Sequence, residues 1–106
     1  MTYGLKDTHI DKIKGVFAQY SKLQEVILYG SRAKGTYKHA SDIDLVLKGD
    51  DLTLHDLYSI EQALDDLLLP WRMDVSLHHH IDNKQLLAHI ERVGVVFYAR
   101  AEKVGE

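Results

Sequence analysis

Two aspartates separated by one residue are the part of this sequence best suited to chemistry. Asp42 and Asp44 flank Ile43 in a segment with strand character, so both carboxylates leave one face while Ile43 points the other way. Two carboxylates about 6 Å apart at an effective dielectric near 20 repel each other by roughly 2 to 3 kcal/mol. A cation relieves this repulsion, and Mg²⁺ prefers such oxygen ligands. The pair therefore predicts a magnesium site.

A glycine-serine turn stands ten residues before these aspartates. Gly30 and Ser31 directly follow residues 26–29, a short apolar run that predicts a buried strand entering a turn. Such a turn can open a short helix whose free backbone N–H groups, helped by the Ser31 hydroxyl, bind triphosphate oxygens. Arg32 and Lys34 follow closely enough to neutralise phosphate charge, although each could instead be a surface charge.

A third aspartate is expected to join the pair. Residues 73–77 alternate apolar and polar side chains, as a half-buried strand does, and Asp74 lies on the polar face. If this strand neighbours the strand of Asp42 and Asp44, three carboxylates surround one cleft. That is the ligand set of a two-metal site, whose ions, about 3.5 to 4 Å apart, stabilise the attacking and leaving oxygens. Each motif alone is more often structural, but their joint spacing favours a functional site.

With these residues in place, the chain resembles the minimal nucleotidyltransferases of the DNA polymerase beta-like superfamily. Their pattern is Gly-Ser, ten residues and Asp-x-Asp, which Gly30, Ser31, Asp42 and Asp44 reproduce without insertion or deletion. Length and element order are similar over nearly the whole chain. The resemblance implies that the Gly-Ser pair binds the triphosphate of ATP, that the paired aspartates bind metal, with two Mg²⁺ ions as cofactor, and that Asp74 assists the acceptor hydroxyl.

The resemblance also implies a partner protein. Nothing after Gly94 is long enough to form a second domain that holds an acceptor, and minimal nucleotidyltransferases often work beside a HEPN-domain protein. The chain is then expected to be an antitoxin in a hetero-oligomer, attaching AMP from ATP to a tyrosine of a HEPN-type ribonuclease toxin. Two alternatives stay open: a non-catalytic antitoxin that neutralises its partner by binding, and a small-molecule nucleotidyltransferase. The residues alone show neither the base, the acceptor nor the partner.

Composition limits the number of domains, the binding partners and the cellular location that the chain is expected to have. A chain of 106 residues with 45% hydrophobic and 27% charged residues predicts one domain, with a core over about 8–99 and a loose tail at 101–106. A net charge of -3 with scattered cations argues against direct nucleic-acid binding, and the lack of cysteine excludes disulfides and thiolate chemistry. No apolar run approaches the roughly 20 residues of a membrane span and no signal peptide is evident, so a cytoplasmic location is expected.

Periodicity predicts a small α/β (α+β) fold, with a mixed sheet and helices packed mainly on one face, as in a nucleotidyltransferase. Two helix starts carry a capping-box pattern, Thr8 with Asp11 and Thr53 with Asp56. The predicted helices span 8–20, 53–68 and 82–93, and the predicted strands span 26–29, 43–47, 73–77 and 95–98.

Several other side chains invite a functional interpretation that the pattern does not favour. The run His78, His79 and His80 suggests zinc, but neighbouring strand residues point to alternate faces, so a solvated loop or strand end is preferred. Trp71 is interpreted as a packing residue at the start of a strand. Tyr29 is expected in the core and Tyr37 at the surface, with a nucleotide pocket as the alternative for both tyrosines.

Overall fold

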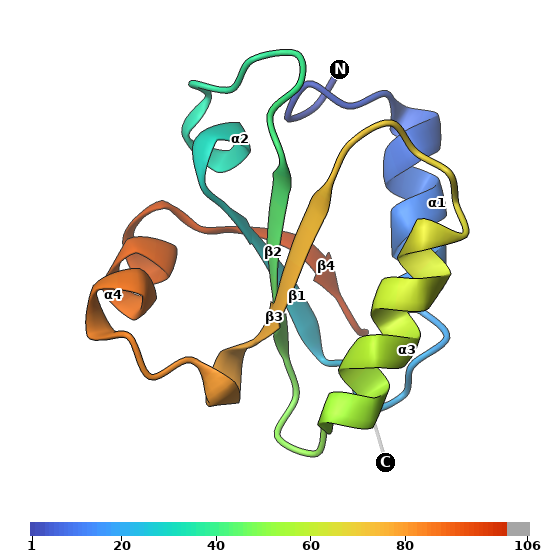
Figure 1. Ribbon diagram of the computed structural model, residues 1–106, viewed down its shortest axis with the longest axis vertical. Coiled ribbons are helices and arrows are strands. Elements are labelled where there is room, and N and C mark those ends of the chain that lie inside the picture. Colours follow the sequence, from blue (N-terminus) through green and yellow to red (C-terminus); the bar gives the residue numbers. More distant parts are fainter. Residues whose placement is uncertain (102–106) are drawn as a thin grey trace.

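A computed structural model describes residues 1–101 of the chain as one four-stranded sheet with helices on both faces (Figure 1). In chain order the elements are α1 (Asp7–Phe17), β1 (Glu25–Tyr29), α2 (Ser31–Lys34), β2 (Ile43–Lys48), α3 (Leu54–Asp65), β3 (Met73–Leu77), the 3₁₀ turn η1 (His78–His80), α4 (Lys84–Val93) and β4 (Val95–Ala99). Within residues 1–101, none of the helices is both long and apolar enough to cross a membrane.

The sheet is mixed, as the sequence predicts. Its strand order is β3-β2-β1-β4, with β1 antiparallel to both β2 and β4. Strand β3 runs parallel to β2, and α3 makes the crossover connection that a parallel pair needs. The chain therefore brings the start of β3 beside the start of β2, close to the end of β1.

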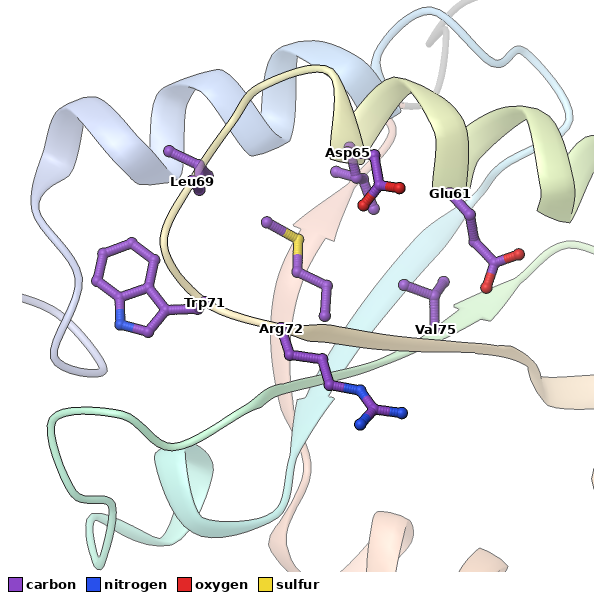
Figure 2. A pocket seen from close by; sticks show the side chains of 8 residues that line it. Glu61, Asp65, Leu69, Trp71, Arg72 and Val75 are labelled. Atoms are coloured by element: carbon purple, nitrogen blue, oxygen red, sulfur yellow. The ribbon is translucent and has the colours of Figure 1, made fainter.

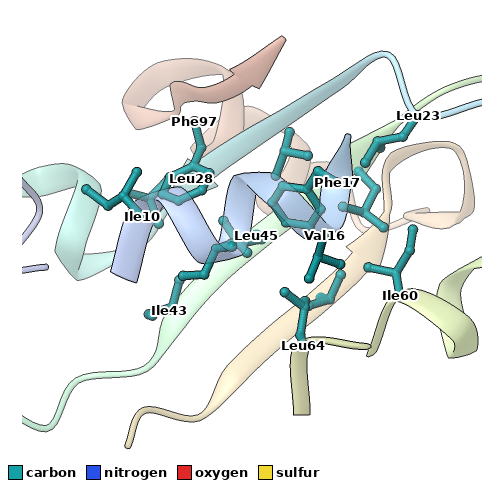
Figure 3. Packing of buried hydrophobic residues seen from close by; sticks show 14 of the residues in the cluster. Ile10, Val16, Phe17, Leu23, Leu28, Ile43, Leu45, Ile60, Leu64 and Phe97 are labelled. Carbon is teal, nitrogen blue, oxygen red and sulfur yellow. The ribbon is translucent and has the colours of Figure 1, made fainter. Parts of the chain in front are cut away.

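The main core lies between the sheet and the helices α1 and α3. Helix α1 buries one stripe of apolar residues three or four positions apart, which is the spacing that places side chains on one helix face. Figure 3 shows this stripe and α3 meeting the inward side chains of the strands. Buried members from these elements include Ile10, Ile13, Val16, Phe17, Leu28, Ile43, Leu45, Ile60, Leu64 and Phe97.

The opposite face of the sheet is covered in part by α4. Ile90 of this helix packs on a smaller buried cluster formed by Ile27, Tyr29 and Val46. Figure 1 shows α4 across the sheet from α1 and α3. The predicted fold class is confirmed, with two long helices on one face and α4 on the other.

The start of α1 differs from the prediction. The N-cap is Lys6, whose side chain makes no capping hydrogen bond, and Thr8 already lies inside the first turn. The predicted capping box of Thr8 and Asp11 is therefore wrong, because the chain enters the helix two residues earlier. The helix ends at Phe17 rather than at Tyr20.

The ends of the other long helices follow from local hydrogen bonds. The capping box that opens α3 is confirmed: the Asp56 amide donates to Thr53 Oγ1 at 3.2 Å, and the Thr53 amide donates to Asp56 Oδ2 at 2.9 Å. Leu68 has a left-handed φ of 56° after the helix, which ends at Asp65 rather than running to 68. Helix α4 starts slightly later than predicted because Asn83 caps it.

The three histidines form the turn η1 directly after β3. His79 Nε2 lies 3.1 Å from the Leu52 carbonyl oxygen, and the rings of His79 and His80 meet edge to face at 4.6 Å. Among the described residues, no three histidine, aspartate or glutamate side chains are grouped so as to hold a metal ion. The preferred loop interpretation agrees with this turn. Residues 102–106 of the predicted tail lie outside the described part of the chain.

Candidate active site

Three polar side chains form a row across one face of the sheet. Tyr29 at the end of β1 is the register partner of Asp44 on β2, and Asp44 is the register partner of Asp74 on β3. Directly paired residues of neighbouring strands project from the same face, about 4.8 Å apart along the sheet. The sequence predicted that Asp74 lies beside Asp44 only if the strands that carry them are neighbours. The parallel pairing of β2 and β3 meets that condition.

This row, together with Asp42 next to it, concentrates negative charge. Asp42 directly precedes β2 and is exposed, Asp74 is exposed, and Asp44 between them is half-buried. Burial raises the pKa of Asp44, the charges of Asp74 and Asp42 raise it further, and His89 and Arg32 partly oppose that rise. Protein groups alone therefore leave the negative charge of these carboxylates incompletely balanced.

The glycine-serine turn approaches this charge closely. Gly30 has a φ of 75°, and a Cβ added there would lie 3.2 Å from Asp44 Cγ and closer still to a carboxylate oxygen. Ser31 then opens the four-residue helix α2, and Gly35 ends it in the left-handed conformation. The first N–H groups of a helix have no intrahelical partner, and those of α2 follow directly after Gly30, the residue that packs against Asp44. Lys34 is exposed on the last turn of α2.

Arg32 lies elsewhere than either sequence interpretation expects. Its side chain is only 2% exposed, which excludes a surface charge. The guanidinium donates to the backbone carbonyls of Tyr3, His39 and Ser41 instead of pointing into open space for a phosphate. The predicted phosphate contact of Arg32 is therefore not supported, because loop and N-terminal backbone already use its donors.

Sequence reasoning missed His89. For Tyr29 it gave core packing as the default, which the buried position of this residue confirms, and a nucleotide pocket as the alternative. The rings of Tyr29 and His89 meet edge to face at 6.2 Å, so α4 brings an imidazole to the carboxylate row. Burial, and then the charges of Asp74 and Asp44, raise the pKa of Tyr29 to about 12. In the sequence, only the position of Tyr29 at the end of a predicted strand, directly before Gly30, indicates that it lies near the site. No sequence pattern distinguishes His89 from the other residues of α4.

The carboxylates fit a magnesium ion by their chemistry. Mg²⁺ in proteins is usually held by one or two carboxylates together with substrate phosphates and water, rather than by a complete cage of side chains. Asp42 and Asp44 supply the carboxylates, Asp74 adds a third on the neighbouring strand, and their mutual repulsion is the observation that a cation would relieve. Within residues 1–101, Asp42, Asp44 and Asp74 are not grouped as a three-ligand metal site, so the three-carboxylate ligand set stays a prediction.

A separate cavity of about 440 Å³ lies on the other side of β3. Figure 2 shows Glu61 and Asp65 reaching from α3 toward the strand, with Trp71 at one end. Met73 and Val75 line it, and because strand side chains alternate, Asp74 between them faces the opposite way. This cavity is therefore distinct from the carboxylate row.

The fold has known counterparts. The chain belongs to the family described as Polymerase beta, Nucleotidyltransferase, whose sequence profile matches residues 11–103. A search of curated proteins found no match. Family membership thus agrees with the class of enzyme that the Gly-Ser and Asp-x-Asp spacing predicts.

Solved structures share this fold. A chain from a toxin-antitoxin complex with AMP-PNP is 24% identical with a TM-score of 0.70, over 86% of this chain and 73% of that one. A chain from the complex of a tri-AMPylated Shewanella oneidensis HEPN toxin with its MNT antitoxin is 19% identical with a TM-score of 0.67, over 91% and 74%. A nucleotidyltransferase described as putative from Sulfolobus solfataricus is 23% identical with a TM-score of 0.54, over 86% and 77%.

Proposed function

We propose that this chain is an antitoxin that transfers AMP from ATP to a tyrosine of a HEPN-type ribonuclease toxin. The observation that carries the proposal is the register of the sheet, which pairs Asp44 with Asp74 and sets Gly30 against the Asp44 carboxylate. A triphosphate bound at the turn of Gly30 and Ser31 would therefore lie beside the acidic row.

The reaction needs few groups from the protein. The acceptor oxygen attacks the α-phosphorus, a new O–P bond forms, the bond to the bridging oxygen breaks, and pyrophosphate leaves with that oxygen. Ser31 and the N–H groups of its turn hold the phosphate oxygens, with Lys34 as the nearby cation. Asp74 accepts the proton of the acceptor hydroxyl, because its exposed position lets an entering hydroxyl come within hydrogen-bond reach. Mg²⁺ held by Asp42 and Asp44, with Asp74, would supply charge neutralisation at the phosphates.

The openness of the row supports a protein acceptor. Asp42 and Asp74 are exposed, so a side chain from another protein can reach the same face of the sheet. A tyrosine is long enough to enter and becomes nucleophilic once its proton is lost. Adding AMP beside a ribonuclease site brings negative charge and bulk, which would repel and block anionic RNA. The solved complex of an AMPylated HEPN toxin with an MNT antitoxin has a chain of this fold.

Intact mass spectrometry tests the transfer directly. The chain is mixed with ATP, Mg²⁺ and a candidate partner, chosen as a short all-helical protein encoded in a neighbouring reading frame, and the partner is then separated and weighed. We expect a persistent mass gain of one AMP or more, and none with Asp44→Asn. Neutralisation without any mass change, equally strong with Asp44→Asn, would instead establish the non-catalytic antitoxin.

A second experiment tests the triphosphate position. Ser31→Ala should weaken binding of Mg²⁺·AMP-PNP by about 1 to 3 kcal/mol, the range for losing a hydrogen bond to a charged group. Ser21→Ala is the matched control, because Ser21 is exposed in the loop before β1, at the end of that strand remote from Tyr29. Equal affinities of both variants and the native protein in calorimetric titration would place the phosphates elsewhere.

A further inference from the structure

Arg32 is the one charged residue that is almost completely buried among residues 1–101, with 2% of its surface exposed. Its Nη1 donates to the Tyr3 carbonyl at 2.9 Å. Its Nη2 donates to the carbonyls of Ser41 at 2.7 Å and His39 at 3.3 Å, and its Nε also donates to Ser41 at 3.1 Å. One guanidinium thus joins the N-terminal segment to the loop that ends just before Asp42.

Aromatic rings enclose the same guanidinium. Its Cζ lies 5.3 Å from the ring centroid of Tyr37 and 5.5 Å from that of Trp71, both within the range of cation–π attraction. Trp71 Nε1 also donates to the His39 carbonyl at 3.2 Å, so the segment just before β3 holds the same loop. Gly4 leaves room for this packing, because a Cβ there would lie 2.8 Å from Arg32 Nη1.

The loop held in this way runs over residues 35–41 and connects the phosphate-binding turn with the acidic pair. Ser41, whose carbonyl receives two of the four hydrogen bonds, directly precedes Asp42. Burial lowers the pKa of Arg32, and the charges of Tyr37, Asp42 and Asp44 oppose that fall. Moving this loop would therefore move Asp42 relative to Asp44, which the sheet fixes.

We propose that Arg32 is a positioning residue, whose guanidinium anchors the 35–41 loop through the carbonyls of His39 and Ser41 and so sets the place of Asp42 beside Asp44. Its link to catalysis rests on the function proposed above. Arginine suits this place because its planar fork can serve carbonyls in different directions and stack between rings, whereas lysine offers a single charged point.

Arg100 offers a matched control at the other end of the sheet. It also donates to backbone carbonyls, those of Leu23, Tyr20 and Ala18, and so ties the loop after α1. It follows β4, whose last residue pairs with the start of β1, whereas Asp44 pairs with the end of β1. Loss of Arg100 removes a similar anchor without touching the loop that carries Asp42.

The experiment compares Arg32→Met, Arg32→Lys and Arg100→Met with the native chain, at a temperature where thermal melts show all four folded. Amide hydrogen exchange is measured over residues 36–43, and kcat and KM for ATP are measured with the partner toxin as acceptor. We expect Arg32→Met to speed exchange in this loop about tenfold and to lower kcat about 10- to 100-fold, with KM for ATP within about threefold. Arg32→Lys should fold better than Arg32→Met yet recover only part of kcat, and Arg100→Met should change neither readout.

Unchanged exchange in the loop of Arg32→Met and Arg32→Lys would overturn the inference, as would an equal loss of kcat in Arg100→Met. A native kcat retained by Arg32→Met despite faster exchange would also overturn it. If the native chain transfers no AMP while Arg32→Met still frees the loop, the proposed function fails and the anchoring role of Arg32 stands.

Discussion

Replacing Asp44 by asparagine is expected to stabilise the metal-free protein, although it removes a group central to the proposed chemistry. Asp44 is half-buried and has Asp74 as its direct register partner on β3. Neighbouring strands lie about 4.8 Å apart, so the two carboxylates stand roughly 5 to 6 Å from each other. The substitution keeps the shape of the side chain and removes its charge.

The expected gain in the free energy of unfolding follows from the positions of Asp44 and Asp74. At an effective dielectric near 20 the repulsion reaches about 3 kcal/mol as an upper value. Because Asp74 is exposed, water and salt reduce it to about 1 kcal/mol, which corresponds to a rise in Tm of about 5 °C for a chain of this size. Asp74→Asn should gain less, because it relieves the repulsion but not the burial of the Asp44 charge, and the double variant should gain less than the sum because both changes relieve one pair.

The stability gain of Asp44→Asn should depend on pH in a defined direction. Burial, and then the charges of Asp74 and Asp42, raise the pKa of Asp44 in the folded chain above its value of 3.8 in the unfolded chain. The folded state therefore keeps a proton that the unfolded state loses, and the destabilisation by Asp44 grows as pH rises through the folded-state pKa. The advantage of Asp44→Asn should be full at pH 7 and should shrink as pH falls toward 4.

Thermal melts in EDTA at several pH values provide the measurement. Asp50→Asn is the control, because Asp50 is an exposed aspartate after β2 and its loss changes the net charge equally. Adding Mg²⁺ should raise the Tm of the native chain more than that of Asp44→Asn. If Asp44→Asn in EDTA at pH 7 melts no higher than the native chain, or if Asp50→Asn gains as much, the repulsion does not exist at this site.

Three further substitutions test other parts of the structure. Gly30→Ala should lower the free energy of unfolding by about 1 to 3 kcal/mol and weaken Mg²⁺·AMP-PNP binding, since the new Cβ strains a φ of 75° and displaces Asp44; urea melts and calorimetry measure both effects. Thr53→Ala should cost about 1 kcal/mol in urea melts through loss of the cap on the Asp56 amide, with no effect on nucleotide binding. The third substitution is Tyr29→Phe. Burial raises the pKa of Tyr29 in the folded chain to about 12, so its hydroxyl contributes to the free energy of unfolding below pH 10, and this contribution is lost as pH rises from 10 to 12. The native chain should therefore lose roughly 1 kcal/mol more than Tyr29→Phe between pH 9 and 11, and parallel losses would contradict the shift.

Local patterns predicted much of the fold because the interactions that set them are close in sequence. The strand of Asp44 follows from alternation, and the start of α3 follows from Thr53 and Asp56, which bond each other within one turn. The same approach failed at Thr8, where a capping-box pattern exists but the backbone enters the helix earlier. A pattern of four residues cannot show where the preceding segment directs the chain.

The sequence by itself determined which residues are candidates for the proposed chemistry. The spacing between Gly30, Ser31 and the pair Asp42 and Asp44 is a property of the chain, and strand alternation fixes that both aspartates share a face. These features need no distant contact, so they are visible before any fold is known.

Tertiary structure decided which other side chains lie beside those residues and which contacts fix the loop between them. Asp74 becomes the neighbour of Asp44 only because β3 pairs in parallel with β2, and His89 reaches Tyr29 only because α4 crosses to that face of the sheet. Arg32 looked like a phosphate ligand from its neighbours in sequence, yet its donors bind carbonyls of segments that meet only in the folded chain. Hydrogen bonds between distant segments depend on the whole topology, which short-range spacing does not encode.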